Sequence, residues 1–144
     1  MSILRDDRLV ALHDLVEACR ASAGHGALAA ETMSGDARAG ELQAMAQHRS
    51  GMADFFAERM IESDDMPAAP PAERNLLQTA LATAKAAFAD DGEAALLAGC
   101  RAREEEVLRC AEAAELAPLG AAEKAAAKTL AAAAHQCLGS LLNV

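Results

Sequence analysis

The stretch that decides the fold runs from Leu97 to Ala111 and reads LAGCRAREEEVLRCA. Its apolar residues recur at alternating steps of three and four, as on one face of a helix. The members of this stripe are Leu97, Cys100, Val107 and Ala111. One charged residue, Glu104, falls on the same stripe, between two apolar turns. The stretch therefore predicts an amphipathic helix whose buried face contains a carboxylate.

The composition of the whole chain agrees with helices. Of its 144 residues, 39 are Ala and 18 are Leu, while Trp and Tyr are absent and only three are Phe. Ala and Leu favour helices, whereas strands are enriched in β-branched and aromatic residues. We therefore expect an all-α protein in which alanine faces bring the helices close together and leave little room for a large cofactor.

The same periodicity predicts four long helices and one shorter helix. The long helices are expected at about residues 7–33, 37–62, 92–116 and 118–142. Residues 63–91 form the connection between the second and third of them. Three prolines interrupt this connection, Pro67, Pro70 and Pro71, and a short helix is expected after them, at about 72–89.

Glycines and a cap residue mark further features of the first half. Gly35 is suited to a left-handed turn after the first helix, and Asp36 is a suitable N-cap for the second. Gly24 and Gly26 lie inside the first helix, where we interpret them as a point of close helix packing.

The connections predict the topology. Short turns make the first two long helices antiparallel neighbours, and likewise the last two. The 63–91 connection is long enough to travel the length of a bundle, so that the second and third long helices can run parallel. One long crossover of this kind is the ferritin-like arrangement. We therefore expect a single domain, a ferritin-like four-helix bundle with an additional short crossover helix.

Charge and hydropathy exclude several classes of partner. A formal net charge of −9 disfavours binding to nucleic acid and to anionic lipid. The longest apolar runs have five residues, against about 20 for a membrane-spanning helix. Because the first eight residues include four charged ones and lack an apolar signal core, we expect a cytoplasmic protein. The four cysteines show no C-x-x-C spacing and are expected to be reduced, small buried side chains.

Two charged residues interrupt apolar stripes. Arg49 lies between Met45 and Met52 on the second helix, and Glu104 lies on the third. A charge inside a bundle needs a partner, because burying it alone costs several kcal/mol. Our first interpretation is a buried Arg49–Glu104 pair that fixes the helix register. The alternative is a rotation of the helices that lets both side chains reach solvent.

A metal site is the other hypothesis for the polar residues. Di-metal carboxylate bundles need Glu-x-x-His on two helices, but Met45 precedes His48 and Ala132 precedes His135 at that spacing. The di-metal motif is therefore broken, and no cofactor is predicted. A single site for iron, manganese or zinc stays open as an alternative. Its ligands would be Glu17, His48, Glu104 and His135.

Several segments share a pattern with a known family. They are Leu12–Arg20 with Ala29–Glu31, Ala46–Arg49 with Phe56 and Glu58, Cys100–Glu105 with Ala111–Leu116, and the last helix with His135. Over about residues 9–142 they resemble a bacterial family of unknown function within the ferritin-like superfamily. The resemblance implies a ferritin-like bundle with no assigned reaction, in which Arg49 and Glu104 match family positions.

The chain also departs from that family. Ala21-Ser22 and Gly24-His25-Gly26 stand where the family has Asp-Gly followed by Gly-Tyr, and a third-helix Tyr is replaced near Cys110. These departures argue against an inherited polar site in this chain. The match of Arg49 and Glu104 to family positions favours a structural pair over a metal pocket.

The sequence favours a non-enzymatic protein that acts through binding or assembly. G-x-S-x-G, the P-loop and a strand-linked G-x-G-x-x-G are all missing. We expect a homodimer or larger assembly, and the pattern identifies no protein partner. One alternative is a metal-binding or oxidative-stress protein with a degenerate carboxylate–histidine site. Another is an alanine-rich, self-associating structural protein in the manner of phasins.

Overall fold

The computed structural model describes residues 3–64 and 92–143, and the side chains of 7–62 and 92–143. Within these ranges it contains four helices and no strand. The helices are α1 (Ile3–Thr32), α2 (Arg38–Asp64), α4 (Glu93–Glu115) and α5 (Ala121–Gly139). The all-α prediction is thus confirmed for this part of the chain, whereas the short helix expected at about 72–89 lies outside it. None of the four helices combines the length and the apolar character needed to cross a bilayer.

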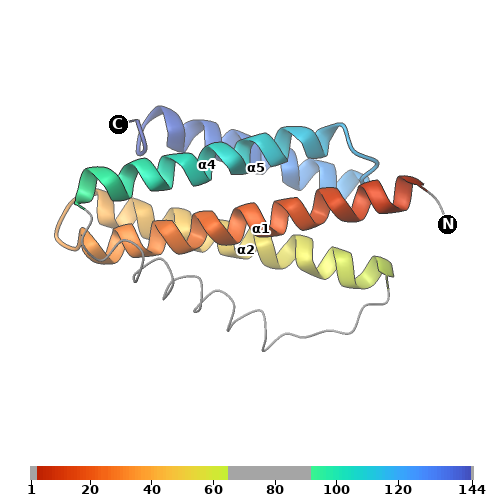
Figure 1. The fold of residues 1–144 in the computed structure, drawn as a ribbon, viewed down its shortest axis with the longest axis horizontal. Coiled ribbons are helices and arrows are strands. Elements are labelled where there is room, and N and C mark those ends of the chain that lie inside the picture. Colours follow the sequence, from red (N-terminus) through yellow and green to blue (C-terminus); the bar gives the residue numbers. More distant parts are fainter. Residues whose placement is uncertain (1–2, 65–91, 144) are drawn as a thin grey trace.

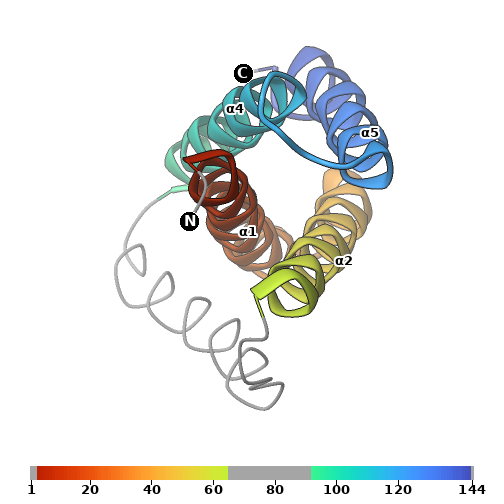
Figure 2. The same cartoon turned by 90° about the vertical axis from the view of Figure 1, so that its right-hand side faces the viewer.

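The helices form a ring around a common core. Helix α1 packs against α2 and α4, and α5 packs against α4 and, less extensively, against α2. Helices α2 and α4 therefore lie across a diagonal of the bundle (Figure 2). Helices α1 and α5 run in one direction along the bundle, and α2 and α4 run in the other (Figure 1). The second and third long helices are parallel, as the length of the 63–91 connection allows.

The turn between α1 and α2 uses the residues that the sequence suggested. Gly35 has a φ of 98°, in the left-handed region that favours glycine. The Asp36 carboxylate accepts a hydrogen bond of 2.8 Å from the backbone N–H of Arg38, the first residue of α2. This hydrogen bond holds the pKa of Asp36 below its ordinary value. The cap explains why α2 begins where it does.

Helix α5 begins at Ala121, three residues later than the expected start at Pro118. Gly120 is extended, and its N–H donates a 2.8 Å hydrogen bond to the carboxylate of Glu123. An acidic residue at this third helical position satisfies a backbone donor that the helix itself leaves unpaired. Glu123 is also buried and forms an ion pair with Arg8 of α1, which ties the start of α5 to the rest of the bundle.

The other end of α5 is also shorter than expected, at Gly139 rather than at residue 142. The chain turns back there, so that the N–H of Leu142 donates to the carbonyl of Cys137 at 2.7 Å. Arg101 of α4 donates to the carbonyl oxygens of Leu138 and Leu142 at 3.2 and 2.8 Å. A cation at the C-terminal end of a helix satisfies its last carbonyl groups and stops the helix there.

The apolar core is divided into two clusters. The first is built around Leu12, Leu15, Phe56, Val107 and Leu130. The second is built around Met33, Leu42, Met45, Leu97 and Leu142. All four helices contribute buried apolar residues to the first cluster, and α1, α2 and α4 extend into the second, where Leu142 represents the chain after α5. The core is therefore interrupted partway along the bundle axis.

Gly26 lies where α1 packs directly against α2. A Cβ atom built on it would lie 2.9 Å from Cε of Met45 and 3.4 Å from Cβ of Ala46. Gly26 is buried, and so is Gly24. The interpretation of Gly26 as a packing glycine is confirmed, because a Cβ atom there would press on Met45 and lie in contact with Ala46 and the backbone of α2.

We expect Gly26→Leu to lower the free energy of unfolding by roughly 1–3 kcal/mol, the range for overpacking a filled core. Gly51→Leu is the matched control, since Gly51 is an exposed residue of α2 at which an added Cβ atom would meet nothing within 4 Å. That control should stabilise α2 by up to about 1 kcal/mol through helix propensity. Urea unfolding measures the free energy of unfolding of both variants. Equal changes for the two variants would contradict the close packing of α1 on α2 at Gly26.

Candidate functional site

Four side chains, one from each helix, meet at the level where the core is interrupted. They are Ser22 of α1, Arg49 of α2, Glu104 of α4 and Cys137 of α5. On α1, α2 and α4, apolar residues on one side of this level belong to the first cluster and those on the other side to the second. On α5, the residues before Cys137 belong to the first cluster, and Cys137 itself packs against the second. We call these four residues the polar layer.

Arg49 and Glu104 form the centre of the polar layer. Their residue exposures are 1% and 0%, so that both charges are removed from solvent. Nε of Arg49 lies 3.0 Å from Oε1 and 3.1 Å from Oε2 of Glu104, and Nη2 donates to Oε2. Because α2 and α4 lie on a diagonal, this pair spans the middle of the bundle. The structure thus brings together the two residues that interrupt the apolar stripes.

The other two members of the polar layer complete its hydrogen bonds. Ser22 donates from Oγ to Oε1 of Glu104 at 3.0 Å. Nη2 of Arg49 lies 3.5 Å from Sγ of Cys137. Both oxygens of Glu104 therefore have donors from the protein itself. A carboxylate whose lone pairs are used in this way can remain ionised inside a core.

The charge of Arg49 depends on Glu104. Burial by itself would lower the pKa of Arg49, but the hydrogen bond and the negative charge of Glu104 raise it above its ordinary value. The guanidinium therefore stays protonated at every pH at which the protein is folded. A charged pair of this kind has a defined geometry, because a planar guanidinium and a carboxylate fit together in only a few orientations.

His48 links the polar layer to the surface. Nη1 of Arg49 donates to Nδ1 of His48, whose side chain is exposed. A ring nitrogen that accepts a hydrogen bond carries no proton, so that the neutral ring has its proton on Nε2. Partial burial, followed by the charge of Arg49, lowers the pKa of His48 below its ordinary value of 6.5. Protonation of His48 would set a second positive charge against Arg49.

The cysteines are free thiols and are not poised as nucleophiles. Burial raises the pKa of both Cys19 and Cys100 to about 12, and raises that of Cys137 as well. The pKa of Cys110 is raised to about 11, again mainly by burial. Because the thiolate is the reactive and metal-binding form, all four groups stay protonated at neutral pH. Cys19, Cys100 and Cys110 are buried, in agreement with the small-hydrophobe interpretation.

The four-residue metal site proposed from the sequence is not assembled. Glu17 and His135 are exposed on α1 and α5, Nδ1 of His48 is used by Arg49, and Glu104 is enclosed by its own donors. Helical geometry accounts for the position of Glu17, because it follows the buried Val16 and each residue turns the helix by about 100°. No group of three His, Cys, Asp or Glu side chains in the described ranges is placed to hold a metal ion.

Sequence reasoning missed two buried polar residues. Ser22 lies three residues after Cys19 and four before Gly26, which is the spacing of the α1 stripe and could have identified it. Glu123 is 2% exposed, and its place at the third position of a helix after Gly120 is typical of a cap. Nothing local in the sequence points to its partner Arg8, because 115 residues separate the two.

Comparison with known proteins gives no family. No protein-family model, no curated protein and no solved structure matches the chain. The function therefore has to be argued from the chain's own residues.

Removal of Glu104 tests the polar layer. We expect Glu104→Ala to lower the free energy of unfolding by about 3–5 kcal/mol, because it leaves the Arg49 charge buried without a partner. Replacing both residues, as in Arg49→Met/Glu104→Leu, should recover most of that loss, since an apolar pair of similar volume needs no charge compensation. Urea unfolding followed by circular dichroism gives the three values.

The control for this series is Glu106→Ala, which removes an ion pair with Arg109 on the exposed side of the same helix. Exposed pairs contribute about 0–1 kcal/mol, so this variant should unfold almost as the parent does. A Glu104→Ala loss below about 0.5 kcal/mol would show instead that Arg49 and Glu104 are both solvated.

His48 predicts a pH dependence of stability. The unfolded chain takes up a proton at His48 near pH 6.5, whereas the folded chain, with its lowered pKa, does so only at lower pH. Stability should therefore be independent of His48 above about pH 7 and fall as the pH drops below 6.5. Thermal unfolding between pH 5 and 8 measures this, with His48→Gln as the comparison. A slope between pH 5 and 6.5 that is unchanged in His48→Gln would contradict the assignment.

Proposed function

We propose that this protein is a ferritin-like helical bundle with a non-enzymatic role in binding or assembly. One observation carries the proposal: the centre of the bundle is filled by the chain's own polar side chains. Both oxygens of Glu104 accept hydrogen bonds from Arg49 or Ser22. An interior whose polar groups already satisfy one another stabilises and orients helices, and it offers no free group to a substrate.

Two features support the ferritin-like part of the proposal. Helices α2 and α4 are parallel and diagonal, as a single long crossover between them requires (Figures 1 and 2). A carboxylate, Glu104, projects into the centre, where bundles of the di-metal class hold cations. In this chain the guanidinium of Arg49 supplies the positive charge at that place. We propose that the pair does structurally what a cation would do for an isolated carboxylate.

If the interior is closed, the function belongs to the outer faces of the helices. The chain carries a net charge of −9, and its thiols are free, which fits a role in the reducing environment of the cytoplasm. Helical bundles of this kind interact through side chains on exposed helix faces. Self-association is the form of binding that we favour, because the parts needed for it lie on this chain alone.

Sedimentation velocity of the full chain at 5–100 μM tests the proposal. We expect a dimer or a larger assembly, and a chain that stays monomeric up to 100 μM would contradict the role in assembly. In a second arm, ferrous iron, manganese or zinc is added in fivefold excess. The unfolding temperature should stay within a degree of the metal-free value, because Glu104 is already engaged. A rise of several degrees with one metal would favour the metal-binding alternative.

A further inference from the structure

We propose that the face formed by α1 and α4 is the surface through which two copies of this chain associate, around a twofold axis that runs along the groove between these helices. The inference rests on the proposed role in assembly and specifies its geometry. Three properties of the face carry it: a charged groove, an exposed apolar pair at one end, and the matched levels of these residues on two antiparallel helices.

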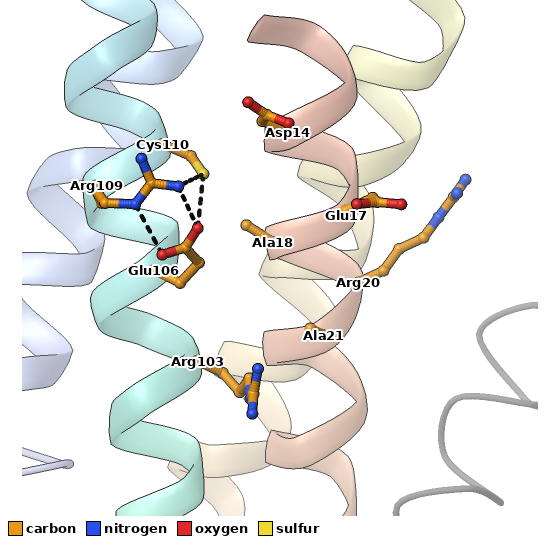
Figure 3. A pocket seen from close by; sticks show the side chains of 9 residues that line it. All are labelled: Asp14, Glu17, Ala18, Arg20, Ala21, Arg103, Glu106, Arg109 and Cys110. Atoms are coloured by element: carbon orange, nitrogen blue, oxygen red, sulfur yellow. Dashed lines mark hydrogen bonds and ion pairs between the residues drawn. The ribbon is translucent and has the colours of Figure 1, made fainter. Parts of the chain in front are cut away.

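The groove between α1 and α4 has walls of opposite charge. It encloses about 530 Å³ and is open to solvent. Asp14, Glu17 and Arg20 line it from α1, and Arg103, Glu106 and Arg109 line it from α4, so that the α1 wall is net negative and the α4 wall net positive (Figure 3). Between them the floor includes Ala18, a small residue that lets another surface approach closely.

Ion pairs within the chain do not cancel the opposite net charges of the two walls. Glu106 is paired with Arg109 on the same helix, so that the α4 wall keeps a net positive charge through Arg103. On the α1 wall Nε2 of His13 lies 3.5 Å from Glu17, and both side chains are more than half exposed. Arg20 also lines the groove from α1, so that Asp14, Glu17 and Arg20 together leave that wall with one net negative charge. The α1 wall is therefore acidic and the α4 wall basic.

One end of the groove carries exposed apolar side chains. Val10 is 59% exposed and Leu116 is 91% exposed, and they are the large apolar residues that the described part of the chain leaves in solvent. Val10 lies four residues before Asp14, and Leu116 seven residues after Arg109, so each falls on the groove side of its helix. Both side chains are therefore available for an apolar contact with another molecule.

Residues of α1 and α4 in this face lie in pairs at the same height along the bundle axis. Ser22 and Glu104 are hydrogen-bonded and fix the register of the antiparallel pair α1 and α4. Val10 lies twelve residues before Ser22, and Leu116 lies twelve residues after Glu104. Glu17 and Arg109 are each five residues from the same reference contact. Because both helices rise by about 1.5 Å per residue, each pair shares one level of the bundle.

A twofold axis along the groove brings residues of equal height along the bundle axis together. It places α1 of one copy opposite α4 of the other and leaves the height of each residue unchanged. Glu17 then faces the partner's Arg109, and Val10 faces the partner's Leu116. Each contact occurs twice, as an isologous interface requires. An axis across the helices would instead set α1 against α1, with acidic walls facing each other. Charge complementarity therefore selects the axis along the groove.

Charge-reversal variants test this pairing. Glu17→Arg and Arg109→Glu each place like charges at both symmetric contacts, so each variant alone should dissociate at concentrations at least tenfold above those of the parent. Mixing the two variants in equal amounts should restore the dimer, because one copy then carries Arg at 17 and 109 and the other Glu at both. Sedimentation velocity with one variant fluorescently labelled detects the mixed species.

Two further variants serve as controls. Lys128→Glu reverses an exposed charge on α5, away from the groove, and should leave the dimer unchanged. Leu116→Asp should weaken the dimer without lowering the unfolding temperature, because Leu116 is almost fully exposed. Thermal unfolding of each variant at low concentration shows that the bundle itself is intact.

The outcomes distinguish the proposal of the α1–α4 face from the proposal of a role in assembly. Restoration of the dimer only in the mixture supports the pairing of Glu17 with the partner's Arg109. A dimeric parent that neither charge reversal weakens, or singles that no mixture restores, would overturn this face while leaving self-association through another surface. A monomeric parent would overturn both the face and the role in assembly.

Discussion

The hydrogen-bonded ion pair between Arg49 and Glu104 is the constraint on which the rest of the structure depends. A buried carboxylate and a buried guanidinium are tolerated only when each satisfies the other, and that requires α2 and α4 to hold one register across the diagonal. Ser22 and Cys137 then bring α1 and α5 to the same level. Alanine-rich faces in the two apolar clusters offer fewer distinctive contacts than a hydrogen-bonded charge pair does. The polar layer therefore constrains the helix register.

Much of the fold could be predicted from local sequence patterns, because helices and turns are determined largely by residues close together in the chain. The stripe through Leu97 and Val107 indicates a helix wherever it is placed, and Gly35 and Asp36 indicate a turn through backbone geometry alone. The predicted ends of α5 were wrong because they depend on tertiary contacts. Arg101 caps its last turn from another helix, and the buried Glu123 is held by Arg8, far away in sequence. The crossover helix expected at about 72–89 stays a prediction.

In the candidate site, too, some features follow from local sequence and others depend on tertiary contacts. Arg49 and Glu104 were visible because a charge that interrupts an apolar stripe is unusual, and each helix reveals its own interruption. Which residues meet at the centre could not be read from spacing, because it depends on how each helix is rotated. That rotation exposes Glu17 and His135, which the hypothetical metal site would have needed inside. It also buries Ser22, whose only signal in the sequence was its spacing from Cys19 and Gly26. The polar side chains at the centre consequently pair with one another, and this is why we propose a role for the outer faces, such as that of α1 and α4.

The most direct test of the central claim is nitrogen-15 NMR of the Arg49 guanidinium at pH 7. If Arg49 is enclosed between Glu104, Cys137 and His48, its Nε–H should give a sharp signal that exchanges slowly with water and shows a nuclear Overhauser contact to the side chain of Glu104. That signal should broaden in Glu104→Gln, which removes the charge but keeps the shape. An Arg49 Nε–H signal in the parent that exchanges as fast as that of an exposed arginine, without contact to Glu104, would contradict the account.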